Sequence, residues 1–142
     1  MSISANLDRI RNEIADACTR AHRDPATVAL MAVSKMHPAE ALLEALAGGQ
    51  YLFGENRVQE WQSKTVAIAA TGLEMHLIGP LQNNKTNKAA ELFHAVDTID
   101  SFKTAEIEPG ASPSFIQWYP RRDIVRDLLV KMEAQFLVEL FF

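Results

Sequence analysis

The sequence of 142 residues lacks several features that define particular classes of protein. Its one cysteine, Cys18, excludes an internal disulfide and a cysteine-based zinc site, and is typical of a reducing compartment. No apolar run approaches the ~20 residues that a membrane-spanning helix needs. The first eight residues lack the basic and then apolar form of a signal peptide. We therefore expect a cytoplasmic protein with no membrane partner.

Basic residues are also scarce relative to acidic ones. The 14 lysines and arginines are outnumbered by 18 aspartates and glutamates, which gives a formal net charge of −4. Nucleic-acid-binding surfaces are basic, so this balance argues against a nucleic-acid partner. The four histidines lie on separate predicted elements without the spacing of metal ligands, and we predict no metal site. The content of 48% hydrophobic and 23% charged residues is that of one globular domain.

What the sequence does contain is a regular alternation of apolar segments and amphipathic helices. We predict a leading helix at residues 4–22 and then strands separated by helices. The strands are expected at residues 28–35, 51–54, 73–79 and 95–99. Strands and helices that alternate in this way form a parallel sheet with right-handed crossovers, so the predicted fold class is α/β.

One predicted strand ends in a charged residue at a position where such folds bind ligands. Residues 28–35 are apolar until Ser34, and Lys35 stands at the carboxyl end of the predicted strand. Ligand sites of parallel α/β folds lie at this end of the strands. Two interpretations stay open. Either the lysine stem packs on apolar surface while its ammonium reaches water, or a partly desolvated amine forms a Schiff base with a carbonyl compound.

Two further polar residues accompany the predicted strands. Asn56 follows the second strand at the same edge as Lys35, where it contacts a cofactor, caps the next helix, or does both. His76 lies towards the start of the third strand, where it either forms a structural hydrogen bond or contacts a cofactor. We take Lys35, Asn56 and His76 as candidate cofactor-binding residues and predict no catalytic residue.

The regular pattern ends after residue 106. A fifth strand is predicted near residues 115–117, and no similar alternation follows from residue 118 onward. Apolar residues then recur at helical spacing and predict an amphipathic helix at residues 123–140. We expect this helix to cover part of an open sheet edge.

Four short motifs resemble those of one protein family. They are AVSK at residues 32–35, FGENRVQE at 53–60, HLIGPLQNNK at 76–85 and VDTID at 96–100. In order and separation they resemble the motifs of the YggS-like proteins, also called proline synthase co-transcribed homologues or pyridoxal phosphate homeostasis proteins. Arg57 departs from the pattern, because the family commonly has tyrosine at this position.

The resemblance implies both a fold and a function. The family has the (β/α)8 TIM barrel of fold-type III, like the N-terminal domain of alanine racemase. It binds pyridoxal 5′-phosphate (PLP) and buffers or delivers this form of vitamin B6 as a monomer, without robust catalysis. By resemblance, Lys35 holds PLP as a Schiff base and the chain takes part in intracellular PLP homeostasis. Its partners would be PLP and PLP-dependent apoenzymes.

The resemblance covers about residues 4–106, whereas a complete barrel needs ~250 residues. We therefore expect an incomplete barrel of four to five parallel strands plus a C-terminal helix, with residues 1–117 as the partial barrel. Residues 118–142 would be a divergent tail, produced by a truncation or frameshift after about residue 117. The family segments that hold the cofactor phosphate have no counterpart here.

Open strand edges would favour self-association of this chain. Two alternative functions stay open. One is an inactive fragment of the family. The other is a PLP-dependent amino-acid racemase, for which neither Tyr51 nor Tyr119 is an evident second acid–base group.

Overall fold

The computed structural model describes residues 2–69, 71–98 and 137–141. Helices and strands alternate through most of this part, as the sequence predicts. In chain order the elements are α1 (Ile3–Arg20), η1 (Pro25–Thr27), β1 (Ala29–Val33), α2 (Ala39–Ala47), β2 (Leu52–Glu55), α3 (Val58–Ile68), β3 (Glu74–Leu77), η2 (Asn83–Lys85), α4 (Thr86–Leu92), β4 (Ala95–Val96) and β5 (Leu137–Phe141). No helix in the described ranges is long and apolar enough to cross a membrane.

Local sequence signals explain where the first helices begin and end. Ser2 caps α1, because its side chain accepts a hydrogen bond from the backbone N–H of Ala5 at 3.2 Å. Pro38 stands directly before α2. Backbone N–H groups at the start of a helix have no partner within the helix, so the missing N–H of proline costs nothing there. After α2, Gly49 adopts a φ of 76°, a left-handed conformation that a helix cannot contain and that glycine adopts without strain.

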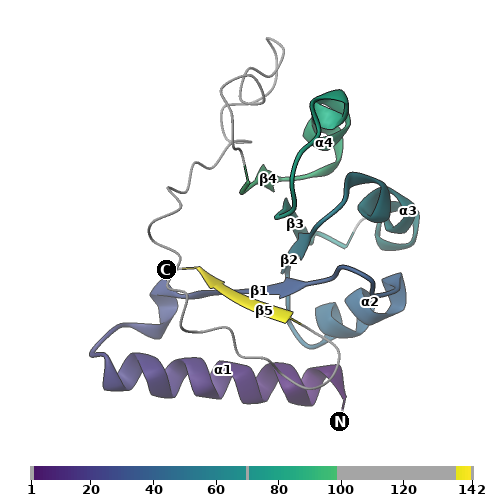
Figure 1. The fold of residues 1–142 in the computed structure, drawn as a ribbon. Coiled ribbons are helices and arrows are strands. Elements are labelled where there is room, and N and C mark those ends of the chain that lie inside the picture. The colour runs from purple at the N-terminus through teal and green to yellow at the C-terminus, as the bar shows by residue number, and fades with distance from the viewer. Residues whose placement is uncertain (1, 70, 99–136, 142) are drawn as a thin grey trace.

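The five strands form one sheet in the order β4-β3-β2-β1-β5. Strands β1 to β4 pair in parallel, with Ala32 opposite Phe53 and Phe53 opposite Met75. Helices α2, α3 and α4 lie along one side of these strands (Figure 1). The predicted α/β class and its parallel sheet are therefore confirmed, and the carboxyl ends of β1 to β4 share one edge.

The main core lies between the parallel strands and the helices. Phe53 and Met75 are completely buried on this helix-covered face, where they join a cluster that includes Leu42 and Trp61. The Trp61 indole N–H also donates to the carbonyl oxygen of Leu92 at 2.8 Å, which ties α3 to the end of α4. The burial of such aromatic and aliphatic side chains is the main force that holds the helices on the sheet.

The opposite face of the sheet is called the inner face below. Met31 and Gly54 occupy it, because they alternate along their strands with residues of the helix-covered core. A Cβ on Gly54 would lie 2.9 Å from both Met31 Sδ and Ile78 Cδ1. Glycine at this position therefore lets the side chains of Met31 and Ile78 lie close to the β2 backbone, and a larger residue would require one of them to move.

The fifth strand differs from the prediction. Strand β5 pairs antiparallel with β1, and Val33 lies opposite Leu137. The predicted helix at residues 123–140 is wrong at its last four residues, which belong to this strand. The sequence LVELF suits a strand, and the free edge of β1 supplies its hydrogen-bond partners. The predicted strand at 115–117 and residues 123–136 lie outside the described residues.

Candidate functional site

Lys35 lies just beyond β1 rather than in its last position. The strand ends at Val33, and Lys35 and Met36 form a turn before α2. Met36 has a φ of 63°, and this left-handed conformation is incompatible with an extended strand. Lys35 is half-buried, and its amine has no hydrogen-bond or ion-pair partner among the residues that the structure describes. The amine is therefore available to a ligand.

Backbone pairing continues past the ends of the parallel strands and aligns their carboxyl ends. The N–H of Ser34 donates to the carbonyl oxygen of Gly54 at 2.8 Å, and the N–H of Ile78 donates to that of Glu55 at 2.9 Å. Lys35 and Asn56 thus follow neighbouring strands at one edge of the sheet. This is the edge at which parallel α/β folds bind their ligands.

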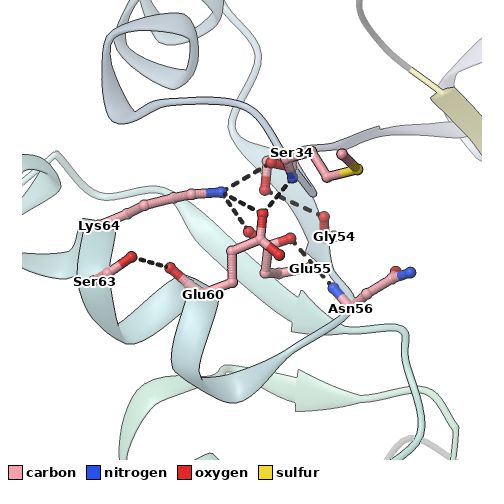
Figure 2. A network of polar contacts seen from close by, with 8 residues as sticks. Ser34, Gly54, Glu55, Asn56, Glu60, Ser63 and Lys64 are labelled. Atoms are coloured by element: carbon pink, nitrogen blue, oxygen red, sulfur yellow. Dashed lines mark hydrogen bonds and ion pairs between the residues drawn. The ribbon is translucent and has the colours of Figure 1, made fainter.

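Asn56 is half-buried at this edge. Its side chain points away from Lys64 in Figure 2, and no described residue forms a hydrogen bond with its side-chain amide, whereas its backbone N–H donates to Glu55 Oε2 at 3.3 Å. Arg57, not Asn56, precedes the first residue of α3, and no side chain caps that helix. The helix-capping alternative is therefore wrong, because the α3 N-terminus begins one residue too late for Asn56 to occupy that position. A cofactor contact of Asn56 stays a prediction.

His76 is the third of the four residues of β3, nearer the carboxyl end of its strand than expected. Both ring nitrogens are engaged: Nδ1 lies 3.0 Å from Asp97 Oδ2, and Nε2 lies 2.9 Å from Glu74 Oε1. A carboxylate only accepts hydrogen bonds, so this pair of contacts suits the doubly protonated ring. Burial lowers the pKa of His76, but the hydrogen bonds to Asp97 and Glu74 outweigh burial and leave that pKa above its usual value.

This arrangement favours the structural alternative for His76. Its ring has no nitrogen left for a cofactor while both carboxylates hold it. Asp97 also keeps a buried oxygen, Oδ1, that has no hydrogen-bond partner among the described residues. A buried acceptor of this kind is costly unless a donor reaches it. A cofactor role for His76 stays a prediction that the structure does not test.

The sequence reasoning missed a second charged cluster, which lies on the helix-covered face. Lys64 Nζ of α3 is 2.6 Å from Glu55 Oε1 and 3.4 Å from Glu60 Oε1 (Figure 2). Glu55 is fully buried and Lys64 is 8% exposed. Burial raises the pKa of the Glu55 carboxyl, and the hydrogen bond and charge of Lys64 offset only part of that rise. The i, i+4 spacing of Glu60 and Lys64 was the available sequence signal.

Among the described residues, the edge of the sheet thus combines an unpaired primary amine on Lys35, an unpaired side-chain amide on Asn56 and close packing around two glycines. A Cβ on Gly79 would overlap the backbone of Asn56, and one on Gly54 would crowd two inner-face side chains. A primary amine can condense with an aldehyde or ketone. Fold and site together therefore define the class: a parallel α/β protein whose lysine amine, unpaired among the described residues, lies at the edge where such folds bind ligands. No three histidine, cysteine, aspartate or glutamate residues of the described ranges could hold a metal ion.

Comparison with curated proteins identifies the relatives of this chain, although no family model matches it. The pyridoxal phosphate homeostasis protein of Escherichia coli K12 is 46% identical over 106 residues, which are 72% of this chain and 45% of that protein. The protein of the same name from Pseudomonas aeruginosa is 45% identical over 105 residues, or 74% and 46% of the two chains. The chain spans about half the length of the curated relatives that it matches.

Solved structures show the same relationship. PipY of Synechococcus elongatus, a COG0325 family member with PLP bound, is 47% identical with a TM-score of 0.56, over 66% of this chain and 45% of that one. A protein from Bifidobacterium adolescentis is 30% identical with a TM-score of 0.67, over 73% and 47% of the two chains. The resemblance inferred from the four motifs is confirmed: this chain is a relative of the pyridoxal phosphate homeostasis proteins over about half their length.

Proposed function

We propose that this chain binds pyridoxal 5′-phosphate through Lys35 and takes part in intracellular PLP homeostasis. One observation carries the proposal. The amine of Lys35 has no partner among the described residues and lies at the ligand-binding edge of a sheet that resembles part of PLP-bound PipY. The curated relatives are named for PLP homeostasis.

The residues at this edge fit the cofactor on its aldehyde side. When bound, PLP supplies an aldehyde that condenses with a neutral lysine amine, with loss of water, to form a carbon–nitrogen double bond. Lys35 provides the amine and keeps the ligand at the edge of β1. Asn56 provides an amide that can donate and accept hydrogen bonds beside it. Gly79 lets the Asn56 backbone lie close to the residues that follow β3, and a Cβ at this position would overlap that backbone.

We propose a PLP carrier rather than an enzyme with robust catalysis. A racemase needs a second acid–base group opposite its lysine. Tyr51 is 57% exposed and stands before the first residue of β2, at the opposite end of that strand from the ligand-binding edge. Tyr119 lies outside the described residues. No described tyrosine therefore stands at the carboxyl edge where Lys35 lies.

The remaining proposals concern where and with what the chain acts. We propose a cytoplasmic location, PLP-dependent apoenzymes as recipients of the cofactor, and no nucleic-acid partner, on the strength of the single cysteine and the net charge of −4. We also propose that the partial barrel occupies residues 1–117 and the divergent tail residues 118–142. Strand β5 covers the outer edge of β1, which leaves β4 as the other edge among the described strands, and we propose this edge as the route for self-association.

The test is a PLP titration of the 142-residue chain, followed by borohydride reduction and peptide mapping. We expect a covalent adduct with its own absorbance band and a reduced pyridoxyl group on Lys35. Lys35→Ala should abolish the band. Lys88→Ala is the matched control, because Lys88 is a lysine paired with Glu91 on α4. A band of equal size in Lys35→Ala would refute the proposal, and no band in the unchanged chain would favour the inactive-fragment alternative.

A further inference from the structure

The turn that carries Lys35 is held on both sides of this residue by side chains of α3. On one side, the carbonyl oxygen of Ser34 accepts a hydrogen bond from Lys64 Nζ at 3.0 Å. On the other side, the backbone N–H of Met36 donates to Glu60 Oε1. Both contacts belong to the network shown in Figure 2. The two peptides that flank Lys35 are therefore fixed by one helix.

Met36 shows that this turn is held by its surroundings and not by its own preference. Its φ of 63° is unusual for a residue with a Cβ. Its side chain is 89% exposed, so packing does not explain the conformation. Residues keep such conformations only where neighbouring contacts determine them. Here these contacts are the Met36 N–H bond to Glu60 and the bond from the His37 N–H to the carbonyl oxygen of Ser34, at 3.1 Å.

The ammonium of Lys64 joins the parts of this arrangement. It is buried, and its three acceptors are Ser34 O at 3.0 Å, Glu55 Oε1 at 2.6 Å and Glu60 Oε1 at 3.4 Å. An ammonium has three N–H donors, so its hydrogen-bonding capacity is matched by these acceptors. Glu60 Oε1 is the same atom that accepts from Met36. Loss of the ammonium would therefore release one side of the turn directly and the other through Glu60.

We propose that Lys64 is a positioning residue, which through Ser34 and Glu60 holds the turn that presents Lys35 to PLP. The inference rests on the proposed function. Lys64 acts through the backbone on either side of Lys35 and does not react with the ligand itself. Its donors are occupied, and its partner Glu55 lies on the helix-covered face, since it alternates with the inner-face Gly54.

The test compares four variants of the 142-residue chain with the unchanged protein. Lys64→Met removes the ammonium, Glu60→Ala removes the acceptor for Met36, and Glu60→Gln restores an acceptor without the charge. Lys88→Met is the matched control, a lysine of α4 whose side chain is 43% exposed. The measurements are the PLP dissociation constant of the borohydride-trappable adduct on Lys35, the amide hydrogen-exchange rate of Met36, and the rate at which succinimidyl acetate acylates Lys35.

We expect Lys64→Met and Glu60→Ala to weaken the adduct by about tenfold to a hundredfold, as small misplacements of reacting groups do. Exchange at Met36 should be faster and acylation of Lys35 should change severalfold. Glu60→Gln should recover most of the exchange protection and affinity, and Lys88→Met should match the unchanged protein.

Unchanged exchange, acylation and affinity in Glu60→Ala and in a folded Lys64→Met would overturn the inference. If Lys64→Met does not fold, Glu60→Ala decides, because Glu60 is 25% exposed and its loss leaves the Lys64–Glu55 pair in place. If the unchanged chain forms no adduct, the proposed function fails. The exchange of Met36 and the acylation of Lys35 need no cofactor, so they still decide whether Lys64 and Glu60 hold the turn.

Discussion

Two buried charged clusters lie on opposite faces of the same sheet, and their positive charges come from different side chains. On the helix-covered face, Lys64 lies between Glu55 and a second glutamate of its own helix. On the inner face, His76 lies between Asp97 and a glutamate of its own strand. Both clusters place one basic side chain between two carboxylates, but only the second is a histidine, whose charge changes near neutral pH.

Buried carboxylates have two different roles in this sheet: one group holds the backbone beside Lys35, and the other pairs with a histidine that can titrate. In the lysine cluster, Lys64 also donates to the carbonyl oxygen of Ser34, next to Lys35. This cluster therefore holds the backbone beside the proposed PLP-binding lysine. The histidine cluster engages both ring nitrogens of His76 but leaves Asp97 Oδ1 without a described partner. We infer that the first cluster shapes the site and the second links the stability of the sheet to pH.

Removal of the Lys64 ammonium should have the largest effect on stability. Lys64→Met leaves the fully buried Glu55 without its nearest opposite charge. Breaking a buried ion pair by removal of one partner costs about 3–5 kcal/mol. Urea unfolding followed by circular dichroism measures the free energy of unfolding. Lys88→Met, at the exposed pair with Glu91, should stay within about 1 kcal/mol of the unchanged protein. Equal losses in the two variants would contradict a special role for burial.

Removal of both charges of that pair should cost less than removal of the cation alone. Burial already raises the pKa of Glu55, so its charge is expensive in the folded state. In Glu55→Gln/Lys64→Met no uncompensated charge remains from the pair. We expect a coupling free energy of about 1–3 kcal/mol in a double-mutant cycle measured by urea unfolding. Additive single and double variants would show that the two side chains are independent.

Loss of charge at Asp97 should have an intermediate effect that depends on pH. Asp97→Asn turns the carboxylate beside His76 Nδ1 into a neutral amide, which keeps one acceptor oxygen but removes the partner charge of the ring. We expect destabilisation of about 1–3 kcal/mol below pH 6.5, the size of a lost charge-assisted hydrogen bond. The cost should shrink at higher pH, where the ring is neutral in both folded and unfolded chains. A cost that is constant from pH 5 to 9 would contradict the charged form of His76.

The smallest effect should be the pH dependence of the unchanged protein. Its sign follows from the raised pKa of His76, because the folded state binds a proton more tightly than the unfolded state does. This stabilisation is complete below the ordinary pKa of 6.5 and is lost as pH rises through the higher folded value. The raised pKa of the Glu55 carboxyl also makes the free energy of unfolding fall as pH rises, in a lower pH range that begins at 4.5. Urea midpoints measured across pH should therefore fall in two steps.

The variant His76→Gln tests which of the two falls in the urea midpoint belongs to His76. It should remove the fall above pH 6.5 and leave the fall that begins at 4.5, since Glu55 lies on the other face of the sheet. A fall above pH 6.5 that persists in His76→Gln would assign the upper step to another group. His37 is a poor candidate, because burial and the charge of Lys64 lower its pKa below the usual value and reverse the sign.

Much of the parallel fold was predictable because it depends on local patterns. Apolar runs, the Pro38 before α2 and the Gly49 after it mark element boundaries that neighbouring residues alone determine. The position of Lys35 at the ligand-binding edge followed from chain order, although the strand ends two residues earlier than predicted. The left-handed Met36 that ends it was not predictable, because its conformation depends on Glu60, 24 residues away.

The fifth strand shows the limit of periodicity. The apolar spacing of residues 123–140 fits a helix, yet Leu137–Phe141 pairs with β1. A short apolar segment can satisfy its backbone groups in either way, and a free strand edge elsewhere in the chain decides between them. The two charged clusters were missed for a similar reason, because Glu55 and Lys64 meet only when α3 packs on the sheet.

The sequence alone was enough to predict the α/β class, the parallel pairing of the strands, the family resemblance and the place of Lys35 at the carboxyl edge of the sheet. These depend on local periodicity, on short motifs and on the fixed handedness of strand–helix–strand connections. The structure was needed to show which charges are buried together and which helix contacts the turn at Lys35. Side chains from separate elements meet through packing, and their free energies then depend on burial and distance rather than on their spacing along the chain.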